Sequence, residues 1–509
     1  MRAASRASEN ATCQSIPRAS RACPWHPRCS YTLSIGTISL LLFTISPTAF
    51  AQIGAERAER AQTRDEPQSF VNQQRGVDER IRREFESEIG TAAKTAFDWG
   101  GWYNLNLFIF DDGVESSRTL RRHDLQLWGR YTMDGGAHDF YARTRLSFID
   151  FNSSDSYDGN DDDVEGPNLE RGVYRFNLAK ALDAYEGRSI DGNLLISAGR
   201  DLIEFGTGLS LAMKLDHVAM TGVYHDWELT GLVGKTVGSE PEIDLSRTAT
   251  RMHRNFIGTQ LVYTGFERHR PFAYALWQRD QNSEAYISPL QEYDYDSNYF
   301  GIGSTGELMR RLRYSTELVY ETGSSYGHRQ FIEDNDIEAW AYDAELEYLF
   351  PGEHRARASV EYLFGSGDGE RFASPTDSVG GNLGDRKDTS FVAFGYRDTG
   401  LSFAPLYSNL HMWRAGGSFF PWPGDEGLRE VELGTDWFLY YKHHRDGAVS
   451  DPTADVRSGY LGWEMDYYAN WRMTADFAWT ARFGTFFPGA AFDDQTTRTF
   501  FLIGMTWSF

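Results

Sequence analysis

Cysteine is almost absent from the chain. The 509 residues contain only Cys13, Cys23 and Cys29, all close to the N-terminus. These three fall within residues 1–51, which we predict to be a signal peptide for the reasons given in the next paragraph. The exported part of the chain then has no cysteine, which excludes a disulfide scaffold, a thiolate metal site and a cysteine nucleophile there.

Long apolar runs are also scarce. The clearest is LSIGTISLLLFTIS, residues 33–46, which is shorter than the ~20 residues that a membrane-spanning helix needs. Arginines precede this run, and PTAFAQ follows it, with Ala49 and Ala51 in the small-x-small pattern of a cleavage site. The pattern predicts a signal peptide cleaved before Gln52, and an uncleaved anchor is the alternative.

Catalytic signatures and an excess of basic charge are missing as well. The sequence contains no HExxH motif and no P-loop, and its formal net charge is −23. A protein with such a negative net charge is not expected to bind nucleic acid. A Ser/His/Asn arrangement of residues distant in the sequence is the enzymatic alternative, but we expect no enzyme and no nucleic-acid partner.

Aromatic residues and glycines, by contrast, are plentiful in a chain that is polar overall. Aromatics make up 15% of the residues, 49 residues are glycine, and the mean hydropathy is −0.50 with 24% charged residues. This combination is typical of a transmembrane β-barrel, because only alternate residues of each strand face lipid.

Segments of alternating polarity follow one another from residue 97 to the end. In DFYARTRLSF, residues 139–148, apolar side chains share one face and two arginines share the other. The same pattern recurs in RRLRYSTELVYE (310–321), AYDAELEYLF (341–350) and RARASVEYLFG (355–365). A soluble antiparallel sheet alternates in the same way, but here the pattern continues for ~400 residues without a second element to cover the apolar faces.

The connections between these segments alternate between short and long, as in outer-membrane barrels. We therefore predict an all-β fold, a transmembrane antiparallel barrel of 18 strands with an uncertainty of two, in the outer membrane of a Gram-negative-type bacterium. Residues 98–509 form the predicted barrel, 52–97 a charged periplasmic extension and 1–51 the signal peptide. An even strand number returns both ends of the barrel to the periplasm.

The chain ends in an apolar stripe of period two. Its members are Phe501, Ile503, Met505, Trp507 and Phe509. This ending resembles the C-terminal strand of outer-membrane barrels, which the barrel-assembly machinery reads as a signal. We expect these side chains to face lipid as well.

The acidic stretch DSYDGNDDDVE, residues 155–165, is a weak candidate for calcium. Asp158, Asn160 and Asp162 supply oxygen ligands, but Asp163 stands where the EF-hand pattern requires glycine. The alternative is a solvated external loop that bridges cations to lipopolysaccharide. No cofactor is firmly expected.

Arginines recur on the polar face of the alternating segments. The phases above direct six of them to the lumen of the predicted barrel: Arg143, Arg145, Arg311, Arg313, Arg355 and Arg357. We expect Arg130, Arg279 and Arg482 to join them. Rings of arginine select anions in pores. The alternative is that these arginines pair with lumen carboxylates of Glu317, Glu345, Glu347 and Glu361, and the pattern does not decide between the two.

Several motifs resemble the alginate export family of outer-membrane barrels. That family carries a hairpin of the form LGxExD followed by FFPG, and a GR segment followed by LD-x-V. The matching positions here are Leu461, Gly462, Glu464, Asp466, Arg472, Phe486, Phe487, Pro488 and Gly489 in the hairpin, and Gly199, Arg200, Leu215, Asp216 and Val218 upstream.

The resemblance implies an arginine-lined pore that passes an anionic, alginate-like polysaccharide out of the periplasm. A periplasmic export or synthesis complex would be the implied partner. A general or substrate-specific diffusion porin for small solutes is the first alternative. A structural or adhesion barrel plugged by the long loop 365–409 is the second.

Overall fold

The computed structural model describes most of residues 95–509. The stretches outside the description are 1–94, 112, 114–116, 153–154, 156–161, 239–241, 244–251, 282–294, 329–332, 372–373 and 377–386. The predicted signal peptide, nearly all of the predicted extension, Asp158 and Asn160 therefore lie outside the described residues. Within the described part, the helices are too short and too polar to cross a membrane.

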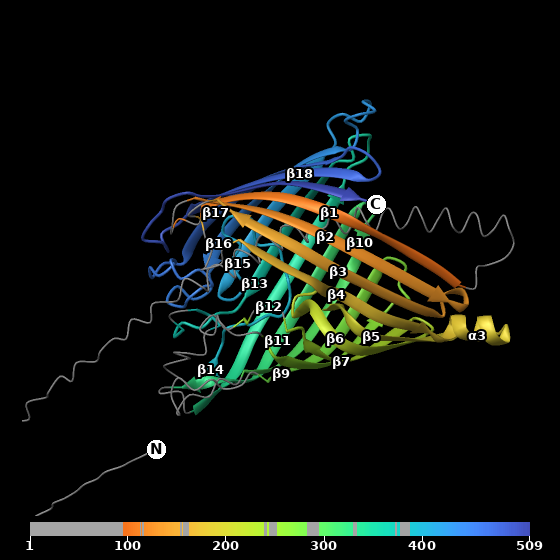
Figure 1. The fold of residues 1–509 in the computed structure, drawn as a ribbon. Coiled ribbons are helices and arrows are strands. Elements are labelled where there is room, and N and C mark those ends of the chain that lie inside the picture. Colours follow the sequence, from red (N-terminus) through yellow and green to blue (C-terminus); the bar gives the residue numbers. More distant parts are fainter. Residues whose placement is uncertain are drawn as a thin grey trace, which may run out of the picture. The chain divides into compact units, whose positions relative to one another are not determined.

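The described chain forms one antiparallel sheet that closes on itself (Figure 1). The strands are β1 (Thr95–Asp111), β2 (Arg118–Met133), β3 (His138–Phe151), β4 (Asp163–Asn177), β5 (Gly192–Phe205), β6 (Leu211–Tyr224), β7 (Trp227–Thr236), β8 (Arg254–Tyr263), β9 (His269–Asp280), β10 (Asp296–Met309), β11 (Leu312–His328), β12 (Glu333–Leu349), β13 (Arg357–Gly365), β14 (Lys387–Asp388), β15 (Leu410–Phe419), β16 (Val431–Lys442), β17 (Tyr460–Arg472), β18 (Phe477–Pro488) and β19 (Arg498–Ser508). Apart from β14, which lies in the β13–β15 connection and pairs parallel with β12, each strand pairs with its neighbours in sequence order, and β19 pairs with β1. The predicted barrel of 18 wall strands is confirmed.

The two ends of the barrel differ in their connections. One end, here called the turn end, has short connections and carries Thr95 and Phe509, the two ends of the described chain. It also carries the 3-10 turn η1 (Asp134–Gly136) and helix α3 (Leu178–Glu186), whose first turn is capped by the side chain of Asn177. The opposite end, the loop end, carries the long connections, among them 366–409 and 443–459.

Each wall strand has an outer and an inner face, as its alternation predicts. On β1, Phe97, Trp99 and Ile109 are exposed, whereas Trp102 and Phe108 between them are buried. Strand β3 follows the same rule, with Phe140 and Phe148 exposed and Arg143 buried. The exposed apolar face suits lipid, and the other face lines the lumen.

The last strand carries the predicted terminal stripe on its outer face. Met505, Trp507 and Phe509 are exposed, and Phe501 and Ile503 are half-buried. Phe509 and Gly101 exchange two backbone hydrogen bonds of 2.9 Å, which joins the C-terminus to β1. The role of this stripe as an assembly signal remains a prediction.

The lumen is not empty. The described residues of the β13–β15 connection (366–371, 374–376 and 387–409) pack against the inner faces of strands from β8 to β18, and we call them the inserted loop. Phe391, Phe394 and Phe403 of this loop are buried against wall residues such as Phe256 and Tyr299. The core of the molecule is therefore inside the barrel, between the wall and the inserted loop.

Candidate functional site

Two of the predicted lumen arginines lie on the inner face of β3. The Nε atom of Arg143 donates to the carboxylate of Glu170 at 2.7 Å, and its guanidinium lies 5.4 Å from the ring centre of Trp102. Arg145 donates to Asp124 and to the hydroxyl of Ser147, both at 3.0 Å. Both arginines are therefore held in polar networks of the wall.

Three others lie on inner faces elsewhere, as their phase predicts. Arg313 of β11 and Arg357 of β13 flank Glu347 at 3.6 and 3.8 Å, close to the turn end. Arg357 also donates to Ser418 and Glu432. Arg482 of β18 is buried, with its guanidinium 5.7 Å from the ring centre of Tyr468.

The prediction was wrong in placing Arg311 and Arg355 on lumen strands. Both lie in turns between strands, with positive φ values of 73° and 45°. Arg355 donates to Glu430 in the next turn at 3.1 Å and lies over the ring of Phe420. Strands β11 and β13 begin at Leu312 and Arg357, so Arg311 and Arg355 lie just before the alternating segments.

Arg279 was also predicted wrongly, because it lies on the outer face of β9. Its register partner on β8 is Asn255, whereas the neighbouring pair Arg254 and Asp280 points into the lumen. Arg279 donates to Asn298 of β10 at 3.0 Å.

Sequence reasoning missed several arginines of the interior. Arg171 and Arg175 of β4 both pair with Asp201 of β5. The segment ERGVYRF alternates, so its period could have revealed them. Arg397 lies in the inserted loop, where no period exists to find it.

Basic and acidic side chains gather on opposite walls. Strands β2–β4 and β11–β13 face each other across the ring, because β3 and β12 are separated by the same number of wall strands in both directions. Arginines outnumber carboxylates on the first wall, with Arg118, Arg122, Arg130, Arg143, Arg145, Arg171 and Arg175 against Asp124, Asp139, Asp163, Glu165 and Glu170. Carboxylates outnumber arginines on the second, with Glu317, Glu321, Asp343, Glu345, Glu347 and Glu361 against Arg313 and Arg357.

Near the turn end, four inward arginines form what we call the arginine vestibule: Arg130, Arg175, Arg313 and Arg357. Each pairs with a carboxylate that is less exposed than the guanidinium. The exposed fractions of the side chains are 33% for Arg130 against 12% for Asp139, 41% for Arg175 against 9% for Asp201, 55% for Arg313 against 23% for Glu347, and 46% for Arg357 against 16% for Glu432. In these four pairs the guanidinium is therefore the more exposed partner, whereas in the neighbouring pair of Arg414 and Glu345 the carboxylate is the more exposed one.

Above the vestibule, Arg397 of the inserted loop lies against the acidic wall. Its Nε atom donates to Asp343 of β12 at 2.7 Å, and its Nη1 atom donates to the carbonyl of Thr207 at 2.8 Å. Burial acts to lower the pKa of Arg397, but the charges of Asp343 and Glu317 outweigh burial and raise that pKa above its usual value. Arg397 is thus a permanent cation that ties the loop to the acidic wall.

The family-motif residues Glu464 and Asp466 hold the same loop. Glu464 is fully buried, and its carboxylate accepts hydrogen bonds from the backbone N–H groups of Leu401, Ser402 and Phe403 at 2.7, 2.6 and 2.9 Å. Asp466 accepts a further bond from Leu401 at 3.1 Å. Their position in the motif therefore corresponds to a structural task, the seating of residues 401–403.

The FFPG part of the motif lies at the loop end of β18. The ring of Phe486 stacks on that of Phe403 at 4.4 Å with an interplanar angle of 8°. Phe487 stacks on Trp463 on the outer face, and Pro488 pairs with Gly462. Gly489 donates its N–H to Leu461 at 2.8 Å.

The upstream motif residues lie where β5 pairs with β4 and β6. Gly199 has a φ of +132°, and a Cβ there would meet the carbonyl oxygen of Gly172 at 2.1 Å. Arg200 makes a forked pair with Asp216 at 2.8 and 3.1 Å. Asp162 of the calcium candidate accepts a hydrogen bond from Phe151, and calcium binding stays a prediction.

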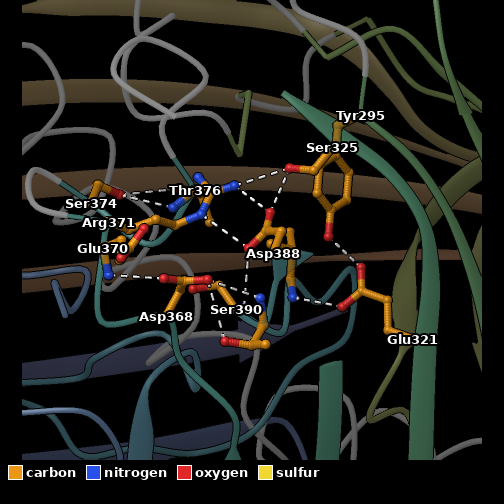
Figure 2. A network of polar contacts seen from close by, with 12 residues as sticks. Tyr295, Glu321, Ser325, Asp368, Glu370, Arg371, Ser374, Thr376, Asp388 and Ser390 are labelled. Atoms are coloured by element: carbon orange, nitrogen blue, oxygen red, sulfur yellow. Dashed lines mark hydrogen bonds and ion pairs between the residues drawn. The ribbon is translucent and has the colours of Figure 1, made fainter. Parts of the chain in front are cut away.

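The outer part of the inserted loop is fixed by a second buried network (Figure 2). Arg371 pairs with Asp388, which also accepts from Ser325 of β11. Glu321 of β11 accepts from Tyr295 and from the N–H of Val392. The loop is thus held at its outer part, at Arg397 and at Glu464.

Comparison with known proteins gives one sequence family. The family model described as alginate export matches residues 221–502. No curated protein matches the chain in sequence.

Solved structures with a similar fold include three from Pseudomonas aeruginosa. OccK11 (OpdR) is 12% identical with a TM-score of 0.49 and covers 81% of this chain and 96% of its own. OccK9 (OpdG) is 11% identical with a TM-score of 0.49, covering 81% and 98%. The outer membrane protein opdK is 12% identical with a TM-score of 0.47, covering 81% and 99%.

Proposed function

Because the chain belongs to the alginate export family and forms a channel in the outer membrane of a Gram-negative bacterium, we propose that it passes an anionic polysaccharide out of the periplasm. The turn end then faces the periplasm, and the arginine vestibule is the entrance. The family is one of transport channels, and no catalytic step is involved.

The exposure of the vestibule arginines carries this proposal. In each of the four pairs, the guanidinium is more exposed to water and solutes than its carboxylate partner. A polyuronate presents one carboxylate per sugar, and a planar guanidinium can grip a carboxylate through two parallel hydrogen bonds. An entrance of this kind attracts the polymer even though the whole chain is acidic.

The partner carboxylates keep each grip weak. A polymer that bound tightly at each arginine would stall, and conduction requires sites that release as readily as they bind. Glu347, which lies between Arg313 and Arg357, competes with the polymer for both guanidinium groups. The sequence left open whether the lumen arginines line a basic path or pair with lumen carboxylates. In this proposal, Arg313 and Arg357 do both, because they pair with Glu347 and also lie on the path.

A channel for small anions is the second candidate function. The observation in its favour is the inserted loop, which occupies the lumen above the vestibule with buried aromatic side chains. A small solute needs less room to pass such a loop than a polymer does.

Removal of two vestibule arginines tests the basic entrance. An exposed guanidinium ~4 Å from a passing anion contributes about 1 kcal/mol in a water-like dielectric, which is about fivefold in an equilibrium. The double variant Arg175→Ala, Arg357→Ala is therefore expected to lower the anion-to-cation permeability ratio about fivefold or more, measured from reversal potentials in a salt gradient.

The matched control is Arg188→Ala, which removes an exposed arginine of the turn end whose ion pair among the described residues is with Glu186. This variant is expected to keep the permeability ratio of the natural protein. An unchanged ratio in the double variant would remove the vestibule from the transport path.

A further inference from the structure

The barrel wall splits between β4 and β5. The two strands pair only from Asn177 and Leu195, near the turn end, up to Gly172 and Arg200. Beyond that point, β4 continues to Asp163 on β3, and β5 continues to Phe205 on β6. Two strand edges therefore diverge from the Gly172–Arg200 pair toward the loop end, and we call the space between them the notch.

The tip of the β5–β6 hairpin, which would otherwise extend the wall beside β4, lies in the lumen. Residues 201–215 form the tip of the β5–β6 hairpin, and they contact the inner faces of distant strands. Gly206 donates to Gln260 of β8 at 2.6 Å, and Thr207 donates to Glu317 of β11 at 2.7 Å. Ala212 and Phe394 of the inserted loop are joined by a backbone hydrogen bond of 3.0 Å. The hairpin tip therefore packs inside the barrel and does not pair with β4 in the wall.

The side of β4 that faces β5 resembles an unpaired sheet edge over residues 163–169. Residues 163–169 are exposed without interruption, on both faces. They include Pro167 and two acidic residues, which are typical of edges that avoid pairing with another strand. Among the described residues, only the Nη1 atom of Arg200 bonds to this edge from across the notch, at the carbonyl of Leu169. Unpaired backbone does not face lipid tails, so we expect the part of this edge that no described residue pairs to border water or a polar solute.

Guanidinium groups lie on both faces of the wall at the base of the notch. On the inner face, Arg175 and Arg171 lead from the vestibule to Asp201, where β5 leaves β4. On the outer face, Arg200 pairs with Asp216, whose register partner on β7 is Lys235. An anionic chain therefore meets basic side chains before and after it crosses the wall at this place.

Part of the lumen at the loop end is closely packed. Phe403, Phe486 and Phe492 form a fully packed aromatic cluster between the inserted loop and β18. This packing lies along the half of the barrel remote from β4. The basic wall of β2–β4 leads instead to the notch.

We propose that the anionic polymer leaves the barrel sideways, through the notch between β4 and β5. This inference rests on the proposed function, because it names the exit of the same path. It assigns Arg171 and Arg200 to the two sides of the exit, and it requires no displacement of the aromatic packing at the loop end.

The test places a bulky group in the notch. The described residues contain no cysteine, so a single introduced thiol reacts selectively. Asn168→Cys lies on the exposed edge of β4, and Gln495→Cys is the matched control in the exposed β18–β19 connection at the loop end. Each refolded full-length mature variant is coupled to a maleimide-polyethylene glycol, and barrel closure is checked by heat-modifiable gel mobility.

The readout is the block of single-channel current by a polyuronate added at the turn end. A polymer that passes through escapes faster as the driving voltage rises, whereas a trapped polymer stays longer. After coupling, Asn168→Cys is expected to show block events that lengthen with voltage, and Gln495→Cys events that still shorten. Events that shorten with voltage in coupled Asn168→Cys would overturn the side exit. Absence of block in both uncoupled variants would instead overturn the proposed function, and the exit with it.

Discussion

Glu464→Gln is expected to release residues 401–403 of the inserted loop and to raise the single-channel conductance. The carboxylate of Glu464 accepts three backbone N–H groups while it is fully buried on β17. The glutamine side chain has nearly the same size, but one of its two terminal atoms is a hydrogen-bond donor that would face another donor. A hydrogen bond to a charged group contributes about 1.5–3 kcal/mol, so the loss of one of the three should weaken the seat of the loop by about that amount.

Glu347→Gln is the matched control for this variant. Glu347 is also a lumen carboxylate, but its ion pairs are with Arg313 and Arg357 of the wall. It should alter ion selectivity and leave the loop seated. An unchanged conductance in Glu464→Gln, in barrels that close normally by heat-modifiable mobility, would show that Glu464 does not hold the loop.

The second large effect is expected from Arg397→Ala. This change leaves the carboxylates of Asp343 and Glu317 without the cation that lies 2.7 and 3.9 Å from them. Loss of one partner from a buried ion pair costs about 3–5 kcal/mol, because the remaining charge is uncompensated. We expect a more open lumen and a shift of the permeability ratio toward cations, measured by conductance and reversal potential.

Arg397→Lys separates the charge from the geometry. Lysine keeps the positive charge but cannot bond at once to Asp343 and to the carbonyl of Thr207 in the way that the guanidinium does. Its permeability ratio should stay close to that of the natural protein, while its conductance rises. Equal shifts of both properties in the two variants would argue against charge as the determinant of selectivity.

The wall of the barrel could be predicted because its strands alternate strictly. On β3, β11, β12 and β13 the lipid face is apolar and the lumen face is charged, so period two identifies both strand and face. Strand ends are less well defined by this signal. Arg311 and Arg355 continue the polar phase for one more position, but the chain already turns there.

The prediction failed where the filling of the barrel makes both faces apolar. On β9 the lumen face carries Phe272, Tyr274 and Leu276, which pack in the core, so period two no longer separates the faces and Arg279 was placed on the wrong one. The tip of the β5–β6 hairpin also leaves the wall and contacts the interior, so period two does not separate a lipid face from a lumen face there either.

The inserted loop could not be derived from local patterns at all. Its contacts join Leu401 to Glu464 and Arg397 to Asp343, residues that are distant in the sequence and follow no common period. The family motif identified Glu464 and Asp466 as notable positions without indicating their task. The exposure of each guanidinium relative to its carboxylate, on which the proposed entrance depends, is likewise a property of the folded wall alone.

The most direct test of the account is the single-channel current of the refolded mature protein in a planar bilayer, recorded with and without a polyuronate at the turn end. We expect an anion-selective current that the polymer blocks in discrete events, and we expect this block to weaken when Arg175 and Arg357 are replaced. A current that is indifferent to the polymer, or selective for cations, would contradict a path for an anionic polysaccharide through the arginine vestibule.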